Sequence, residues 1–226
     1  CLQETKREDE KFPMAEINAA GYQVAFSGQK TYNGVAILSK HPITDVVRNN
    51  PRFDDPQQRI LAATIEGMRF ICAYVPNGQA VDSDKYVYKL AWLASLREWL
   101  DAEMRCHGEQ GLAILGDYNI APEDQDVYDP VGWGGEVLCS PKERAALAGL
   151  IGLGLTDSFR LFEQPEKSFS WWDYRQLGYQ KNKGLRIDHI LLSESLAKRC
   201  VACAIDRVPR KWTQPSDHAP VIATLA

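Results

Sequence analysis

The stretch Leu112-Ala113-Ile114-Leu115-Gly116-Asp117-Tyr118-Asn119 joins an apolar run to two polar side chains. A short apolar run bounded by turn residues is typical of a buried β-strand. Residues two apart on an extended strand point to the same side, so Asp117 and Asn119 are expected to share one face of a sheet. The alternative is an Asx-turn, in which the same two residues only terminate the strand.

Three other segments have the same design, with a carboxylate at the end of, or inside, an apolar strand-like run. They are Leu2-Gln3-Glu4-Thr5, Arg186-Ile187-Asp188-His189 and Pro215-Ser216-Asp217-His218. If the ends of these strands converge in one sheet, they form a pocket of acids, a histidine and an amide. Such pockets bind hard divalent cations and cleave phosphate esters. Taken alone, Glu4 is more readily explained as a charge at the solvent edge of a strand than as a metal ligand.

Asp188 lies within the apolar run Leu185–Leu192. Burying a carboxylate there is unfavourable unless it is paired or hydrogen-bonded. His218 can supply a partner from another strand, and such a pair fixes the imidazole tautomer and raises its pKa. The neighbour His189 competes for this role, but successive strand residues face opposite sides.

The pattern of apolar residues predicts many strands and few helices. Strands are expected at 22–26, 35–38, 60–65, 70–75, 112–115, 187–192 and 221–225. Helices are expected at 84–104 and 141–151, with a turn of helix at 193–198. Strands and helices that do not alternate strictly favour sheets packed on each other with helices outside. No linker or repeat divides residues 1–226, so we expect one domain.

The composition is that of a globular domain, with 45% hydrophobic and 25% charged residues. No apolar run reaches the roughly 18 residues of a membrane span. The six cysteines are scattered, as free core thiols are, which fits a reducing cytoplasm. Cys200 and Cys203 have the spacing of a metal or redox pair, but no second ligand pair accompanies them, so we interpret them as structural.

A basic segment stands out from the net charge of −4. Residues 175–211 hold nine Lys and Arg against three acids, a net charge of +6 that leaves −10 for the rest of the chain. This division suits a polyanion bound beside a metal site, or merely a solvated face. The adjacent Trp171-Trp172-Asp173-Tyr174-Arg175 is suited to stacking on bases or sugars, although two consecutive Trp can also be core residues facing opposite ways.

Taken in order, these motifs resemble exodeoxyribonuclease III within the endonuclease/exonuclease/phosphatase superfamily. The resemblance spans essentially the whole chain. It rests on residues 2–5, 34–37, 74–78, 116–122, 169–175, 184–188 and 216–220. The implied fold class is α/β (α+β), a four-layer α/β/β/α sandwich of two mixed sheets flanked by helices. The family's first strand and helix are missing from this chain, so its N-terminal part is incomplete, and we expect lowered stability and weak activity of this piece.

The resemblance implies a DNA-repair hydrolase that uses Mg²⁺ or Mn²⁺. It would cut duplex DNA at abasic sites and remove nucleotides from 3′ ends. The implied catalytic residues are Tyr74, Asp117, Asn119, Asp188 and His218, and the implied metal-binding residues are Glu4, Asp117, Asn119, Asp217 and His218. The implied DNA-binding residues are Asn77, Trp171, Trp172, Arg175, Leu185 and Ile187.

The family's roles carry over to matching positions. Glu4 would be the principal metal ligand, assisted by Asp217, and Asp117 would orient or deprotonate the attacking water. Tyr74, Asn77, Asn119 and His218 would hold the phosphate, with Asp188 orienting His218. Trp171, Leu185 and Ile187 would line a pocket for a baseless sugar, with Arg175 near the DNA.

Two alternatives stay open. One is a phosphatase or phosphodiesterase of the same superfamily acting on a small or lipid phosphate, which would not need the basic segment. The other is a non-catalytic DNA-binding relative, against which stands the full set of competent side chains. A monomer in the bacterial cytoplasm, associated with the nucleoid and not with a membrane, is the default expectation.

Overall fold

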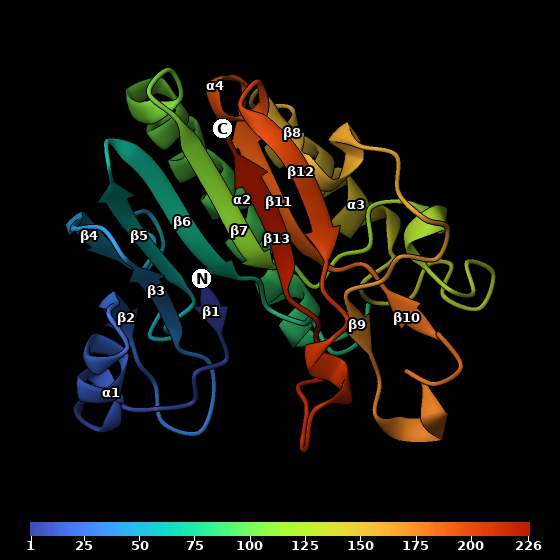
Figure 1. The fold of residues 1–226 in the computed structure, drawn as a ribbon. Helices are drawn as coiled ribbons and strands as arrows, with labels where there is room; N and C mark the ends of the chain where they lie inside the picture. The colour runs from blue at the N-terminus through green and yellow to red at the C-terminus, as the bar shows by residue number, and fades with distance from the viewer.

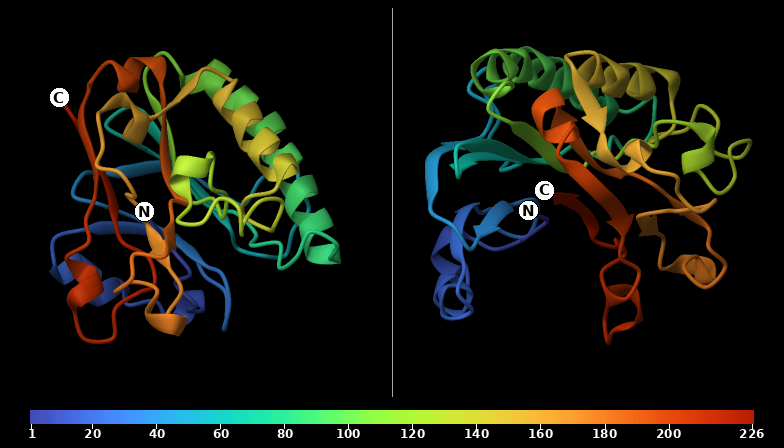
Figure 2. Two further views of the ribbon diagram at one scale, coloured as in Figure 1. Left: turned by 90° about the vertical axis from the view of Figure 1, so that its right-hand side faces the viewer. Right: turned by 45° about the horizontal axis from the view of Figure 1, so that its top comes forward.

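The computed structural model describes residues 1–226 as layers of helices and sheets (Figure 1). In Figure 2, α2 (Asp84–His107) and α3 (Pro141–Ile151) cover one face of a large sheet, and shorter strands lie on its other face. The short helix α1 (Met14–Ala19) packs outside those shorter strands. The predicted four-layer α/β/β/α arrangement is confirmed.

The large sheet has six strands in the order β4-β5-β6-β7-β11-β8. Its strands are β4 (Ile43–Arg48), β5 (Ile60–Ile65), β6 (Met68–Tyr74), β7 (Leu112–Asp117), β8 (Leu155–Asp157) and β11 (Asp188–Ser193). Only β6 and β7 are parallel, and helix α2 makes the crossover between them. The sheet is therefore mixed, as expected.

Both faces of this sheet are buried, which explains its nearly continuous apolar strands. Ile60 and Ala62 of β5 pack toward α2 and α3, in the largest core cluster. Leu61 and Ala63 point the other way, into a second cluster with the shorter strands. Alternating residues of one strand thus join two layers to the same sheet.

The two long helices begin at serine caps. Ser83 accepts a hydrogen bond from the Tyr86 amide at the start of α2, and Ser140 forms a capping box with Glu143 at the start of α3. Both helices were predicted. The buried side of α2 consists of Tyr86, Lys89, Trp92, Leu93, Leu96, Trp99 and Leu100. A lysine in this stripe was not expected.

The second layer consists of two antiparallel pieces. One is the sheet β1-β3-β2, made of β1 (Leu2–Gln3), β3 (Val35–Ser39) and β2 (Gln23–Ser27). The other is the pair β12 (Cys200–Ile205) and β13 (Val221–Leu225). No strand of this chain lies between β1 and β13, so the second layer is divided into these two antiparallel pieces.

The remaining elements are short. Strands β9 (Trp171–Trp172) and β10 (Gly184–Leu185) form an antiparallel pair, and α4 (Glu194–Ala197) follows β11. The 3₁₀ turns are η1 (Asp9–Lys11), η2 (Asp124–Asp126), η3 (Ser158–Leu161), η4 (Arg175–Leu177) and η5 (Pro209–Lys211). The six cysteines are free. None of the helices has the length and apolar character needed to cross a membrane.

All seven predicted strands are confirmed within two residues at their ends, and the strand-like start of the chain is confirmed as β1. The predicted helical turn at 193–198 corresponds to α4. The strands that were not predicted are β4, β8, β9, β10 and β12. They are short, or they lie at the edge of a sheet, where the apolar pattern is weak.

Candidate active site

Three neighbouring strands of the large sheet bring polar side chains to the same edge. Tyr74 ends β6 and is paired in register with Asp117, which ends the parallel strand β7. Asp188 begins the antiparallel strand β11 and is paired with Asp117 on the other side. The end of one strand therefore lies beside the start of its antiparallel neighbour, and Tyr74, Asp117 and Asp188 form one row.

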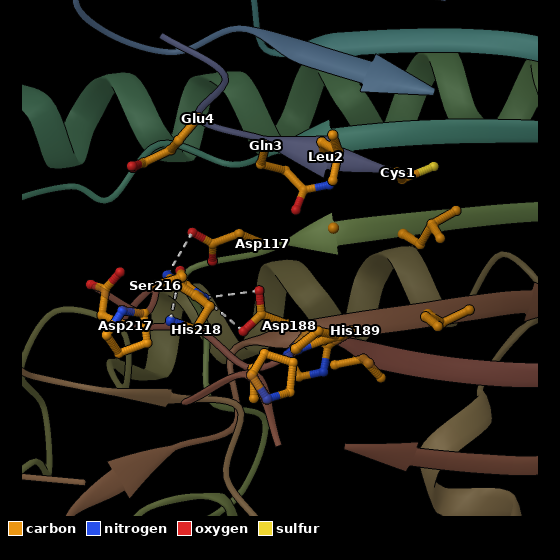
Figure 3. A pocket seen from close by; sticks show the side chains of 18 of the residues that line it. Cys1, Leu2, Gln3, Glu4, Asp117, Asp188, His189, Ser216, Asp217 and His218 are labelled. Atoms are coloured by element: carbon orange, nitrogen blue, oxygen red, sulfur yellow. Dashed lines mark hydrogen bonds and ion pairs between the residues drawn. The ribbon is translucent and has the colours of Figure 1, made fainter. Parts of the chain in front are cut away.

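The second layer supplies the facing side chains. Glu4 follows β1, and Asp217 and His218 precede β13, so both pieces of that layer contribute. These residues, together with Asp117 and Asp188, line a cleft of about 440 Å³. Figure 3 shows Glu4 on one side of Asp117 and the pair Asp217-His218 on the other. The four motifs found in the sequence meet in this cleft.

His218 links two of the acids. Its Nδ1 lies 2.9 and 3.0 Å from the two carboxylate oxygens of Asp188, and its Nε2 lies 3.9 Å from Oδ2 of Asp117 (Figure 3). Burial acts to lower the pKa of His218, but Asp188 and Asp117 outweigh it and raise the pKa to about 10. The imidazolium form is therefore favoured at neutral pH, and the predicted Asp188–His218 pairing is confirmed.

His189 has a different environment from His218. Its side chain is buried, with Nε2 2.8 Å from the carbonyl oxygen of Ile120 and Nδ1 3.0 Å from Arg186. Burial and the nearby Arg186 lower the pKa of His189, so the ring stays neutral. His189 is therefore not the partner of Asp188, because successive residues of a strand face opposite sides.

Glu4 is held by two donors. The Tyr74 hydroxyl donates a hydrogen bond to Oε1 of Glu4, and the Lys6 ammonium lies 2.7 Å from Oε2. Burial would raise the pKa of Glu4, but the bonds from Lys6 and Tyr74 outweigh it and hold the pKa below its usual value. Burial and Glu4 raise the pKa of Tyr74, which keeps its hydroxyl protonated as a donor.

Asn119 reaches Asp117 through a turn. The strand ends at Asp117, and the backbone N–H of Asn119 donates to Oδ1 of Asp117 over 2.8 Å. Asn119 itself is in the left-handed region, at φ 50°. This is the Asx-turn alternative. The expectation that both residues share a strand face is therefore corrected, yet the turn still brings the side chains together, with Nδ2 of Asn119 2.9 Å from Oδ2 of Asp117.

The amide of Asn119 has all its partners within the protein. Its Nδ2 also donates to the carbonyl oxygen of Val75 over 3.0 Å, and its Oδ1 accepts from Nδ2 of Asn77 over 3.1 Å. Asn119 is buried, whereas Asn77 is exposed. The geometry gives Asn119 the position of an orienting group for Asp117, and it leaves Asn77 accessible from solvent.

Burial raises the pKa of Asp117 to about 7. His218 lowers this value and Asp188 raises it, so the two neighbours act in opposite directions. A carboxyl group with this pKa exchanges its proton near neutral pH, which is the property required of a general base.

Trp171 is attached to the cleft by its indole. Its Nε1 donates to Oδ2 of Asp217 over 2.9 Å, and its backbone pairs with His218. Trp171 packs against the apolar cluster that contains Leu185 and Ile187, and the sugar pocket expected at these three residues stays a prediction. Leu185 and Ile187 are fully buried, so Trp171 is the only partly exposed member of the three.

The expectation that both tryptophans face DNA is corrected for Trp172. Its side chain is fully buried, because strand alternation turns it to the opposite side from Trp171, against Tyr179. Arg207 covers its ring at 5.0 Å. Arg175 is exposed and is paired with Asp173.

The basic segment 175–211 does not form one continuous surface. Arg186 is buried between Asp126 and Asp157, and Arg210 is buried beside the ring of Tyr179. Lys198 and Arg199 lie between α4 and β12, at the top of Figure 1. The other exposed basic residues of the segment are Arg175, Lys181, Lys183, Arg207 and Lys211.

The donors in the cleft fit a hard metal ion. Oxygen and nitrogen atoms of Asp117, Asp188 and His218 all lie within 4.8 Å of one another. Glu4 and Asp217 line the same cleft but are not in this compact group. A set dominated by carboxylates suits an oxygen-seeking divalent cation that keeps some of its water. Of the other predicted ligands, Asn119 is hydrogen-bonded to Asp117, and the full ligand set stays a prediction.

Several residues of the site were missed from the sequence. Lys6 pairs with Glu4, Arg59 lies 4.7 Å from the ring centroid of Tyr74, and Lys89 contacts the Asn119 backbone. Of these, only Lys89 carries a signal in the sequence, because it interrupts the apolar side of a helix. Lys6 is only two positions from Glu4, and Arg59 reaches Tyr74 from another segment, so neither contact follows a recognisable sequence pattern.

The chain is similar to known proteins over nearly its whole length. The family model described as "Endonuclease/Exonuclease/phosphatase family" matches residues 1–218. Exodeoxyribonuclease III of Haemophilus influenzae is 39% identical, over 98% of this chain and 87% of its own length.

Two solved structures match over the full chain and over 87% of their own lengths. A 3′ phosphatase from Neisseria bound to a product DNA hairpin has 45% identity and a TM-score of 0.97. An AP endonuclease from Archaeoglobus fulgidus has 37% identity and a TM-score of 0.95. The chain belongs to the endonuclease/exonuclease/phosphatase family and, within it, to the exodeoxyribonuclease III group.

Proposed function

We propose that this chain is a metal-dependent DNA-repair nuclease that cuts DNA at abasic sites and removes nucleotides from 3′ ends. The observation that carries the proposal is the row of Asp117 and Asp188 facing His218 in one cleft. Carboxylates beside a cationic imidazole suit the hydrolysis of a phosphodiester, whose charge rises in the transition state. The names of the related nucleases favour DNA as the substrate.

Mg²⁺ or Mn²⁺ is the proposed cofactor. Glu4, Asp117, Asp188 and Asp217 offer carboxylate oxygens to the cleft, and these are the ligands that such ions prefer. When bound, the ion neutralises charge on the phosphate and lowers the pKa of a water molecule. The Tyr74 hydroxyl and the Lys6 ammonium keep Glu4 ionised and oriented for this task.

Asp117, His218 and Asn77 have separate roles in the proposed reaction. Asp117, with a pKa near 7 and held by Asn119, takes the proton of the attacking water. His218, kept protonated by Asp188, donates from Nε2 to a phosphate oxygen. The exposed Asn77, which is bonded to Asn119, adds a second donor. Each group works in the protonation state that its own neighbours favour.

Selectivity for damaged DNA comes from the wall of the cleft. Trp171 presents a partly exposed ring beside Asp217, where a sugar without a base would pack and a full nucleotide would be crowded. The exposed Arg175, Lys181 and Lys211 supply charge for the DNA backbone. This need for backbone charge favours DNA over the small or lipid phosphates of the alternative reading. A monomer acting at the nucleoid is consistent with these parts.

A second activity, removal of a 3′-terminal phosphate, is favoured by the likeness to the Neisseria 3′ phosphatase. The same groups would act on a terminal phosphate as on an internal one, because both reactions break a P–O bond at a 3′ carbon. The two substrates differ in whether DNA continues past the cleft. Three 5′-labelled duplexes therefore separate the activities: one with an internal abasic analogue, one with a 3′-phosphate and one with a recessed 3′-hydroxyl end.

We expect cleavage of these duplexes with Mg²⁺ or Mn²⁺ and none with EDTA. Asp117→Asn should lower the rate at least about 100-fold and leave DNA binding intact, because it removes the proton acceptor. Glu98→Gln, an exposed position on α2, is the matched control and should cut at the normal rate. Cleavage of none of the duplexes, or a normal rate for Asp117→Asn, would refute the proposal.

A further inference from the structure

The structure contains a fully buried ion pair that takes no part in the proposed chemistry. Lys89 of α2 and Glu143 of α3 form it, and both side chains have 0% exposure. Lys89 lies in the apolar stripe of α2 between Tyr86 and Leu93. Burying two charges is unfavourable unless every donor and acceptor is satisfied, so such a pair calls for an explanation.

The Lys89 ammonium is saturated by three acceptors. It donates to Glu143, to the carbonyl oxygen of Asn77 over 3.0 Å and to the carbonyl oxygen of Asn119 over 2.7 Å. An ammonium has three N–H groups and no others, so each is used. Two of the three bonds go to the backbone of residues at the cleft: Asn77, which follows β6, and Asn119, which follows β7.

Glu143 is saturated as well. Its Oε1 accepts from the Leu138 amide over 3.0 Å, and its Oε2 accepts from the Ser140 amide over 3.1 Å and from the Ser140 hydroxyl. The carboxylate thus fixes the loop that leads into α3, and this loop in turn fixes the carboxylate. Glu143 is thus fixed by this loop and in turn fixes Lys89, which can hold the backbone of Asn77 and Asn119 in place.

The loop that carries Asn77 is packed directly on the lysine stem. Gly78 adopts φ +94°, and a β-carbon there would lie 3.1 Å from Cδ of Lys89. Only glycine tolerates both the backbone conformation and this close approach. The contact ties the backbone position of Asn77 to the position of Lys89.

We infer that Lys89 is a positioning residue that holds Asn77 and Asn119 in register with Asp117. Asn119 has positive φ, so its backbone conformation needs external support. Its carbonyl is fixed by Lys89, while its side chain bonds to Asp117 and accepts from Asn77. The inference rests on the proposed function, because it assigns to Lys89 the orientation of groups that act there.

The test separates positioning from stability with a double substitution. Lys89→Met keeps most of the side-chain volume but leaves Glu143 buried and unpaired, so it lowers both stability and turnover. Adding Glu143→Gln removes the stranded charge and raises the melting temperature again. Turnover stays low in the double variant, because the two carbonyls remain without their donor.

We expect kcat on the abasic duplex to fall about 10- to 100-fold in both variants, with KM changed less than about threefold. Lys89→Arg, which keeps the charge, should recover part of kcat. The matched control is Arg69→Met, which breaks the buried Arg69–Glu103 pair at the opposite end of β6. It should lower the melting temperature without lowering kcat.

A double-mutant comparison and an NMR measurement test the positioning role independently of protein stability. In an Asn77→Ala/Asn119→Ala background, Lys89→Met should cost less than about threefold in kcat, because both side chains that it positions are gone. Side-chain amide NMR signals of Asn77 and Asn119 should shift in Lys89→Met and not in Arg69→Met, whether or not the chain cleaves DNA.

The inference is overturned if kcat recovers together with the melting temperature in the double variant. It is also overturned if the losses in the Asn77→Ala/Asn119→Ala background multiply, or if the amide signals do not move. A wild-type chain that cleaves no duplex refutes the proposed function instead, and the amide signals then still decide the role of Lys89.

Discussion

Replacing Asp188 by Asn tests the electrostatics of the cleft most directly. The substitution keeps the shape of the side chain and one acceptor for Nδ1 of His218, and it removes only the charge. The two side chains lie 2.9 Å apart, with 13% exposure for Asp188 and 28% for His218. The pair is thus shielded enough from solvent for the charge to matter.

The size of the effect follows from the pKa of His218. The difference between its ordinary value of 6.5 and about 10 corresponds to roughly 5 kcal/mol. Asp117 and Asp217 provide part of this stabilisation, and the partial exposure of the ring reduces it. About 2–3 kcal/mol is then left for Asp188, within the range for hydrogen bonds to charged groups. If the bond is fully used in the transition state, kcat falls about 30- to 150-fold.

The pH dependence has a definite sign. A histidine whose folded-state pKa is raised stabilises the protein fully below pH 6.5, and this contribution is lost as the pH rises through about 10. In Asp188→Asn the pKa of His218 drops toward its ordinary value. The variant should therefore lose activity at a lower pH than the wild type, and its stability deficit should shrink above pH 10.

The assay measures kcat between about pH 6 and 10 on the 5′-labelled abasic duplex at saturating Mg²⁺, together with thermal melting of the metal-free chain. Asp173→Asn, which removes a carboxylate paired with the exposed Arg175, serves as the control and should leave both profiles unchanged. A variant at position 188 with normal kcat and an unmoved basic limb would show that His218 does not act as a cation.

Three further substitutions probe other parts of the molecule. Tyr74→Phe removes a donor to Glu4, so the half-saturating Mg²⁺ concentration should rise about tenfold in a metal titration; an unchanged value would separate Glu4 from metal binding. Trp171→Phe keeps an aromatic ring but breaks the bond to Asp217, so kcat should fall about three- to tenfold in single-turnover assays, and no loss would make that bond dispensable. Leu96→Ala opens a cavity in the largest core cluster and should lower the free energy of unfolding in urea by about 2–5 kcal/mol; a smaller change would mean that the helices close the cavity.

The sequence predicts well those parts of the molecule that follow from local chemistry. The strand Ile60–Ile65 is recognisable because its first four residues are an unbroken apolar run that is buried on both faces. The Asp188–His218 pair is predictable because a carboxylate inside an apolar strand requires a partner, and few candidates exist. In both cases the physical requirement lies within one segment.

Other parts could not be predicted from local pattern. Strand β4 contains an irregularity between Thr44 and Val47, and β12 leaves Val201 more than half exposed, so neither shows a clean alternation. The buried pair of Lys89 and Glu143 joins residues 54 positions apart, and only the tertiary fold brings them together. A lysine within an apolar helix stripe indicates that a partner exists but does not identify it.

The cleft exists because the two layers that form it are held together elsewhere. On one side of it, Val35 and Ile37 pack against the large sheet, and on the other, Ile190 and Leu192 pack against β13 and α4. Between these apolar clusters the layers meet mainly through polar bonds, from Tyr74 to Glu4 and from Asp188 to His218. These two bonds set the protonation of the site, and they also fix the distance between the layers at that point.

Two consequences follow for substitutions at the cleft. Removing either bond shifts the pKa of a side chain in the cleft and loosens the gap in which DNA must fit, so kcat and KM should change together. Removing apolar contacts from the flanking clusters should instead lower stability and leave the chemistry intact until the domain unfolds. The stabilising apolar clusters lie on both sides of the site and not within it. The domain therefore stays folded although Glu4, Asp117, Asp188 and His218 line one cleft.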